Sequence, residues 1–171
     1  MIDFCRYLIF QFINNTMNLE TVKSGMKAAS CFTEESIHLK CPVGKIWESI
    51  KEFDWAKLCP SLIKSCKFTS GNPLQLGSTY KLELKDGNSF TYSIVEISEL
   101  ERKITMEMIE CEPKQNFSSL LTSIKCCKVS EDNTSVLNWE TIFSNDVSQD
   151  LLKKRKDTIL SYFKDFKKLE S

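Results

Sequence analysis

The sequence predicts an α+β fold in which a curved antiparallel β-sheet wraps around a long C-terminal α-helix, with two short helices between the first two strands. Three observations predict this fold. A short alternating segment leads into an apolar-periodic helix that begins near Pro42, a series of alternating strands then extends to Phe143, and an amphipathic helix closes the chain. Within one domain the apolar face of that last helix needs a large partner, and we expect the concave face of the sheet to supply it.

The first strand and the two short helices are predicted before the main series of strands. In the first strand, Ile37 and Leu39 face one side and His38 faces the other. Pro42 suits the first turn of a helix, where its missing N–H leaves no hydrogen bond unmade. Apolar side chains then recur at helical spacing at Val43, Ile46, Trp47, Ile50 and Phe53. Residues 54–62 are predicted to form a second short helix or turn.

The later strands alternate between apolar and polar residues. Residues 64–69 are predicted to form one strand, and Asp86-Gly87 is a typical hairpin turn between the next two strands. Three further strands follow, and the sheet ends at Phe143. The side chains expected on its apolar face are Tyr80, Leu82, Leu84, Phe90, Tyr92, Ile94, Ile104, Met106, Met108, Leu120, Thr122, Ile124, Cys126, Leu137, Trp139, Thr141 and Phe143.

The last helix is predicted over residues 147–169. Asn145 or Asp146 is placed to cap its N-terminus. One face is apolar and aromatic, and it carries Leu152, Ile159, Tyr162, Phe163, Phe166 and Leu169. Lysines occupy the opposite face, which predicts that the aromatic face is buried and the basic face is solvated.

Length and composition indicate one globular domain. The chain has 171 residues, which is enough for one core. We expect residues 34–171 to form this domain and residues 1–33 to be an N-terminal extension that is helical or loosely ordered. The extension opens with a short apolar segment. This segment is compatible with a packed or frayed helix, with a start codon placed too early, or with a membrane-surface anchor or weak export signal.

Charge and cysteine content exclude several classes of function. Basic and acidic residues balance at 23 each, so the chain lacks the net positive charge that nucleic-acid binding normally needs, and we expect no nucleic-acid partner. The eight cysteines lie mostly among apolar residues of predicted strands and helices, which indicates reduced, buried thiols in a cytoplasmic protein. Because there is no Cys-x-x-Cys pair and only one histidine, we expect no zinc site and no cofactor.

Beyond these patterns, three segments resemble a known superfamily. They are residues 41–50 with Phe53-Asp54, residues 77–82 with Asp86-Gly87, and residues 133–139 with Phe143. Over about residues 36–169 the chain resembles the polyketide cyclase/dehydrase-like branch of the SRPBCC, or START-like, superfamily, which also contains the Bet v 1-like proteins. The resemblance implies the helix-grip fold and a deep, mostly apolar cavity between the sheet and the last helix.

The cavity implied by the resemblance gives a candidate binding site for a hydrophobic small molecule or lipid. Its expected lining comes from the apolar face of the strands and of the last helix: Tyr80, Leu82, Tyr92, Ile94, Met106, Met108, Trp139, Phe143, Ile159 and Phe163. A phenol on that face could bind the polar end of a ligand or pair within the core, and a methionine could line a ligand or fill the core.

Three functions are compatible with these residues. The first is a non-enzymatic protein that binds, and possibly carries, the apolar ligand. The second is a cyclase-like enzyme that uses Tyr80, Tyr92 or Glu96 for proton transfer. Continued alternation would place Glu96 on the side of Tyr92, but the strand could end before it, and we expect this carboxylate to be exposed. The third is a protein-interaction module whose cavity is filled by side chains. His38 is expected to be a surface histidine rather than a catalytic base.

The densest positive run is Lys153, Lys154, Arg155 and Lys156. Such a run is typical of a solvated helix face. It could also make transient contact with anionic lipids at a membrane surface, which would suit a protein that loads and unloads lipid.

Overall fold

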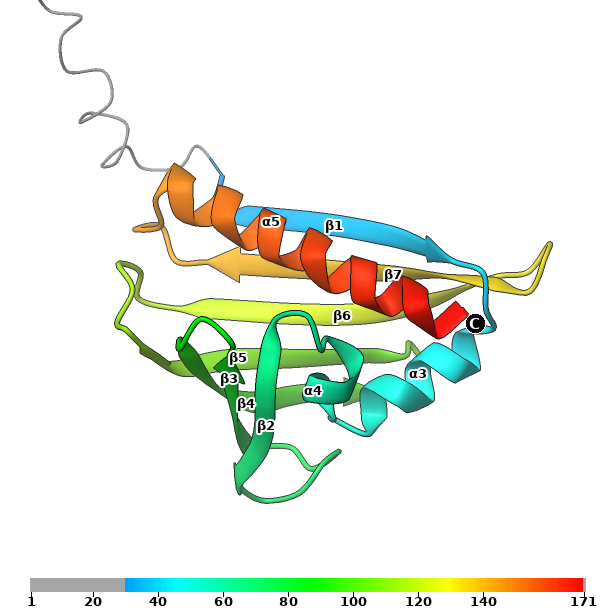
Figure 1. The fold of residues 1–171 in the computed structure, drawn as a ribbon, viewed down its shortest axis with the longest axis horizontal. Coiled ribbons are helices and arrows are strands. Elements are labelled where there is room, and N and C mark those ends of the chain that lie inside the picture. Colours follow the sequence, from blue (N-terminus) through cyan, green and yellow to red (C-terminus); the bar gives the residue numbers. More distant parts are fainter. Residues whose placement is uncertain (1–29, 171) are drawn as a thin grey trace, which may run out of the picture.

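The computed structural model describes residues 30–170, which form a sheet wrapped around helices (Figure 1). In chain order the elements are β1 (Phe32–Leu39), α3 (Val43–Lys51), α4 (Trp55–Leu58), β2 (Ile63–Ser70), β3 (Thr79–Leu84), β4 (Ser89–Ser98), β5 (Lys103–Glu112), β6 (Leu120–Val129), β7 (Thr134–Phe143), α5 (Gln149–Phe166) and η1 (Lys167–Glu170). This order confirms the predicted fold. The apolar N-terminal segment and Cys5, for which the sequence makes predictions, lie outside the described residues.

The described strands form one seven-stranded sheet with the order β1-β7-β6-β5-β4-β3-β2. Every neighbouring pair is antiparallel. From β2 to β7, consecutive strands are joined by short connections, and β1 closes the far edge by pairing with β7. The predicted hairpin at Asp86-Gly87 joins β3 to β4. Gly87 has a φ of 92°, which a residue with a side chain rarely adopts.

Two β-bulges interrupt the pairing of β4 with β5. Ile94 pairs with Met106 and Glu96 pairs with Thr105, so Val95 is one extra residue on β4. A second bulge lies further along, where Ile109 is the extra residue on β5. Because a bulge increases twist and bends the strand, these two irregularities help the sheet to curve.

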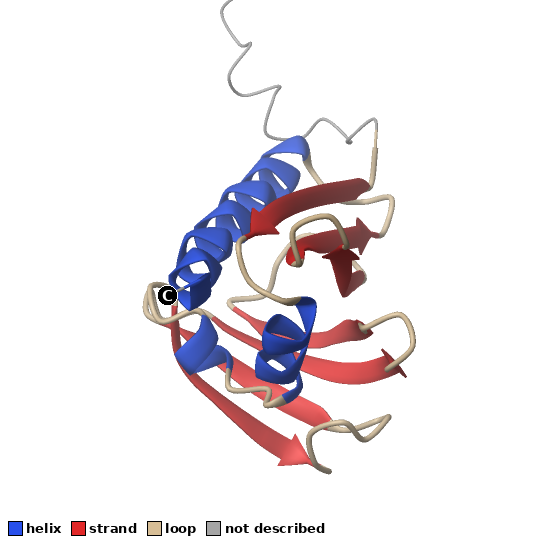
Figure 2. Cartoon of the chain, turned by 90° about the vertical axis from the view of Figure 1, so that its right-hand side faces the viewer, coloured by secondary structure: helices blue, strands red, loops and turns tan. Residues whose placement is uncertain are grey.

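The helices lie inside the curve of the sheet (Figure 2). Helix α5 packs against β1, α4 packs against β2, and α3 packs against β6 and β7. The N-cap of α5 is Ser148, whose side chain accepts a hydrogen bond from the Leu151 N–H at 3.3 Å. The predicted caps, Asn145 and Asp146, are therefore wrong, because the helix begins at residue 149 rather than 147 and Asp146 binds another loop.

Aromatic rings fill much of the space between the sheet and α5. Tyr80 and Tyr92 stack on adjacent strands with ring centroids 5.6 Å apart. Trp139 of β7 stacks on Tyr162 of α5 at 5.3 Å, and Trp55 of α4 lies 6.0 Å from Trp139. Such aromatic pairs add stability beyond that of the apolar area they bury, and these pairs join the sheet to α4 and to α5.

One buried carboxylate joins the C-terminal end of α5 to the loop after α4. Asp165 is 3% exposed, and it accepts a hydrogen bond from the Ser61 N–H at 2.8 Å. Lys168 forms a salt bridge with the same carboxylate at 2.6 Å. Burial alone raises the pKa of Asp165, but the hydrogen bonds from Lys168 and Ser61 outweigh it, and the net pKa is lowered.

Replacing this carboxylate should destabilise the protein. In Asp165→Ala the Ser61 N–H loses its acceptor and Lys168 loses its ion pair with the buried carboxylate. We expect a loss of about 1–3 kcal/mol in the free energy of unfolding at pH 7, measured by urea denaturation. Because the pKa in the folded state is lowered, this contribution is present above the ordinary aspartate pKa of about 4 and is lost as pH falls below it. Asp157→Ala, at an exposed position of the same helix, is the control. Equal stabilities of the two variants would contradict the assignment.

Candidate functional site

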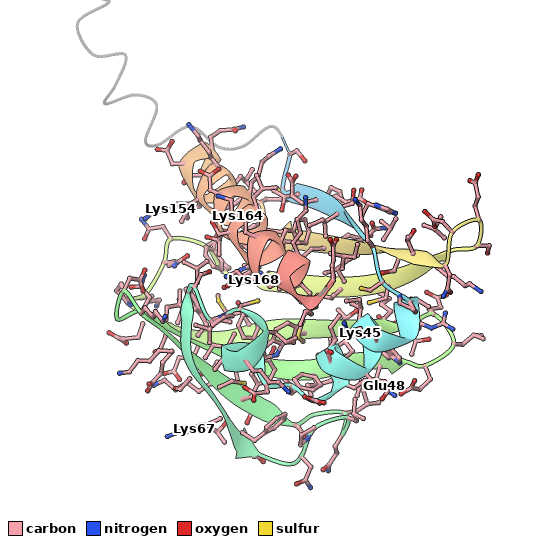
Figure 3. The ribbon with its side chains drawn as sticks, turned by 45° about the vertical axis from the view of Figure 1, so that its right-hand side comes forward. Lys45, Glu48, Lys67, Lys154, Lys164 and Lys168 are labelled. Atoms are coloured by element: carbon pink, nitrogen blue, oxygen red, sulfur yellow. The ribbon has the colours of Figure 1, made fainter. Side chains whose placement is uncertain are left out.

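A pocket of about 160 Å³ lies between the N-terminal half of α5 and the strands beneath it. The C-terminal half of the helix fills its own space with Ile159, Phe163 and Phe166, all of which are buried. The pocket is lined by Leu82, Leu84, Asp86, Asn88, Phe90, Tyr92, Met108, Gln115, Phe117, Leu120, Phe143, Leu151, Lys154, Arg155, Thr158 and Tyr162. Most of the strand residues are apolar, while Lys154 extends outward from α5 at the mouth (Figure 3).

A smaller pocket of about 20 Å³ lies deeper in the molecule. Its lining residues are Trp55, Ile63, Tyr80, Leu82, Tyr92, Met106, Thr122, Trp139, Arg155 and Tyr162. Four of these side chains also line the outer pocket, namely those of Leu82, Tyr92, Arg155 and Tyr162. The two pockets are therefore neighbours, separated by the side chains that they share.

Seven of the ten predicted binding residues line one of the two pockets. Met108 and Phe143 line the outer pocket, and Tyr80, Met106 and Trp139 line the inner one. Leu82 and Tyr92 line both. The remaining three, Ile94, Ile159 and Phe163, are buried in the hydrophobic core and line neither pocket.

Arg155 is the polar side chain of the site that the sequence reasoning placed elsewhere. Its Nη2 donates to Thr122 Oγ1 at 2.8 Å, and its Nε donates toward Thr141 Oγ1 at 3.3 Å. Both threonines are buried, on β6 and β7. The prediction that Arg155 adds to an exposed cationic face is therefore wrong. Helical spacing could have found it, because Arg155 lies four residues before Ile159 and so shares its face.

The neighbouring lysines of this run remain outside. Lys153 and Lys154 are exposed, and Lys156 forms a salt bridge with Glu35 of β1 at 2.9 Å. No salt bridge involves Arg155 within residues 30–170, so its hydrogen bonds go to neutral hydroxyl groups and no carboxylate balances its charge. Contact of the lysines with a membrane surface stays a prediction.

Two residues that line the inner pocket carry hydrogen-bond donors without a partner among residues 30–170. The indole N–H groups of Trp55 and Trp139 are buried, and neither has a hydrogen-bond acceptor in the part of the chain that the structure describes. The Tyr80 hydroxyl donates to the sulfur of Met106 at 2.8 Å, and sulfur is a weak acceptor. Burial raises the pKa of Tyr80 and of Tyr162 above that of an ordinary tyrosine, so both phenols are neutral at pH 7.

Glu96 does not face the pockets. The alternation places it on the side of Tyr92, but the extra residue Val95 turns it to the other face of β4. There its carboxylate accepts a hydrogen bond from Thr105 at 2.7 Å and pairs with Lys103 at 2.8 Å. The hydrogen bond from Lys103 is the main reason why the pKa of Glu96 is lowered. The Glu96 side chain is therefore on the solvent side, as expected, and its carboxylate is ionised at pH 7.

His38 and the described cysteines lie outside the lining of both pockets. His38 is exposed on the side of β1 opposite Leu39, as predicted, and its Nε2 lies 2.7 Å from the Thr134 hydroxyl. The seven described cysteines are free thiols. Burial raises the pKa of Cys66 to about 11 and that of Cys126 to about 12, which keeps both protonated. Within residues 30–170 no three side chains of the metal-binding types group closely enough to hold an ion.

The loop between β5 and β6 forms one wall of the outer pocket through Gln115 and Phe117. Phe117 packs edge-on against Phe143, with ring centroids 5.1 Å apart. Next to it, Ser118 donates to Asp146 through its hydroxyl at 2.6 Å and through its N–H at 3.2 Å. The Ser144 hydroxyl also donates to Asp146. The hydrogen bonds from Ser118 and Ser144 lower the pKa of Asp146 to about 2.

The curved antiparallel sheet, the short helices after its first strand and the long C-terminal helix define the Bet v 1-like helix-grip fold. A protein from Nitrosospira multiformis superposes with a TM-score of 0.73 at 24% identity, over 82% of this chain and 96% of that one. Major latex-like protein 151 from Panax ginseng superposes with a TM-score of 0.69 at 15% identity, over 82% and 97%. Ara h 8.0201 superposes with a TM-score of 0.66 at 18% identity, over 80% and 94%.

These likenesses show the fold, while the cyclase-like branch of the superfamily stays a prediction. Searches of protein-family models and of curated proteins find no match to this chain.

Among residues 30–170 no helix combines the length and the apolar character that a membrane span requires. The cytoplasmic location also stays a prediction.

The role of Asp146 can be tested by removing its charge. Asp146→Asn keeps the size of the side chain, and we expect a lower melting temperature and faster amide hydrogen exchange in residues 113–119 at pH 7. Because the folded-state pKa of about 2 lies below that of an ordinary aspartate, the stabilisation is present above about pH 4 and is lost as the pH falls toward 2.

Asp150→Asn is the matched control, since it removes an acid from the first turn of α5 without changing the contacts of this loop. If both variants speed exchange in the loop equally, the effect belongs to the helix N-terminus rather than to the hydrogen bonds of Ser118.

Proposed function

We propose that this protein binds a hydrophobic small molecule in the pocket between α5 and the sheet. The observation that carries the proposal is the outer pocket itself, which is lined on the sheet side mostly by apolar and aromatic side chains. Ligand sites are typically concave and mostly apolar, with a few polar groups that fix orientation. The resemblance to START-like proteins implies the same use of the same space.

The size of the pocket limits the ligand. An apolar cavity of about 150 Å³ holds a molecule such as benzene, and the outer pocket of about 160 Å³ is similar. A ligand larger than one aromatic ring would therefore extend toward the mouth or require the loop that carries Phe117 to move. Removing about 200 Å² of apolar surface from water contributes about 5 kcal/mol before the cost of immobilising the ligand, so apolar contact alone gives a dissociation constant no lower than about 0.2 mM.

The position of Glu96 favours binding over cyclase-like catalysis. With Glu96 on the opposite face of the sheet and ionised, the proton-transfer mechanism keeps only Tyr80 and Tyr92. Burial raises the pKa of Tyr80, so its hydroxyl stays protonated at pH 7 and cannot act as a base. The pocket volume favours binding over an interaction module with a filled core, because the space beside the N-terminal half of α5 is not occupied by side chains.

Filling the outer pocket should abolish binding without unfolding the protein. Leu151 lines the pocket from α5, and in Leu151→Trp the larger ring should occupy the ligand's space. With the neutral fluorophore 1-aminoanthracene as the probe, we expect binding to the native protein in a fluorescence titration and at least tenfold weaker binding to Leu151→Trp.

Leu160→Trp is the matched control, because Leu160 lies on the same helix but is exposed on its outer face. This variant should bind the probe as the native protein does. If the probe binds no form of the protein, or binds Leu151→Trp as tightly as Leu160→Trp, the pocket is not the binding site.

A further inference from the structure

We infer that the ligand of this pocket carries a carboxylate, and that Arg155 is the residue that receives it. This inference rests on the proposed function and names the class of ligand. It starts from the position of Arg155, whose side chain lines both the outer and the inner pocket and thus stands at their junction.

The guanidinium group of Arg155 has unused capacity. It carries five N–H donors, and two of them point to Thr141 and Thr122 through Nε and Nη2. These two contacts use the edge of the group formed by Nε and Nη2. The edge formed by Nη1 and Nη2 has no acceptor in the described part of the chain, and its two parallel N–H bonds match the two oxygens of a carboxylate.

The electrostatics of the site also favour an anion. Arg155 is partly buried without a carboxylate partner, and hydroxyl groups satisfy its hydrogen bonds without cancelling its charge. At the mouth, Lys154 adds a positive charge and Asp86 a negative one, so the formal charge of the outer lining is positive. Arg155 is already partly removed from water, and a bound anion would neutralise its charge. This attraction offsets part of the free-energy cost of removing the anion from water.

The inner pocket fits only the oxygen end of such a ligand. A volume of about 20 Å³ holds roughly one water-sized group, since a single water needs at least about 10–15 Å³. Two of its lining residues, Trp55 and Trp139, have buried indole N–H groups that lack an acceptor in the described part of the chain, and an indole N–H can only donate. A group placed there should therefore be an acceptor, as a carboxylate oxygen is, and the apolar body of the ligand would lie in the outer pocket.

The inference predicts a preference between two ligands of equal size. Trans-cinnamate and cinnamamide share one apolar body, but only the former has two acceptor oxygens and a negative charge. We expect the native protein to bind cinnamate about tenfold or more tightly than cinnamamide in isothermal titration calorimetry at pH 7. Arg155→Met should remove this preference, because it removes both the positive charge and the N–H donors that a carboxylate would use.

Two further variants test the assignment. Lys153→Met removes a positive charge from the adjacent, exposed position on α5 and should keep the full preference. Arg155→Lys keeps the charge but removes the planar fork, and it should keep only part of the preference. Arg155→Lys also decides the question if Arg155→Met no longer unfolds cooperatively.

The outcomes separate this inference from the proposed function. If 1-aminoanthracene binds in the pocket but cinnamate is not preferred, or is still preferred by both Arg155 variants to the native degree, the carboxylate inference is overturned and the apolar pocket stands. If neither cinnamate nor the fluorophore binds the native protein, the proposed function fails and the inference fails with it.

Discussion

The packing of α5 into the concave side of the sheet is the contact on which the rest of the structure depends. The helix presents large aromatic side chains only in its C-terminal half, where Phe163 and Phe166 fill the space completely. In its N-terminal half the side chains that face the sheet are Leu151, Leu152 and Arg155. A curved sheet leaves more room than these can fill, and the pocket is the space that remains. The pocket and the hydrophobic core are thus neighbouring parts of the same contact between α5 and the sheet.

The polar groups of the site follow from the same geometry. An arginine on the inner face of the helix cannot reach bulk water easily, so β6 and β7 supply Thr122 and Thr141 beneath it. These threonines occupy inward positions of strands whose other inward residues are apolar, such as Ile124 and Trp139. Their hydroxyls make the inner surface locally polar without adding charge. The positive charge therefore remains available to whatever enters the pocket.

Periodicity alone predicted most of the fold. Alternation placed Leu82, Tyr92, Met106 and Trp139 on the inner face, and the 3.6-residue period found the buried side of α5, because both patterns report directly on which side chains leave water. Arg155 was missed as a site residue because it was assigned to the exposed face together with the lysines around it. That assignment used the composition of the run and not the helical position of Arg155. Cavity volume was beyond prediction, since it depends on how the side chains pack and not on which face they occupy.

The bulge at Val95 explains why Glu96 does not lie on the side of Tyr92, where strict alternation would place it. The bulge also determines how this strand tolerates a change in length. One residue more or less in β4 shifts the following side chains between the interior and the solvent, while the strand keeps its neighbours. With Val95 present, Glu96 reaches Lys103 in water and Ile97 pairs with Ile104 inside. The number of residues in β4 is therefore fixed. An insertion or deletion of one residue would break the surface ion pair of Glu96 and place its charge in the core.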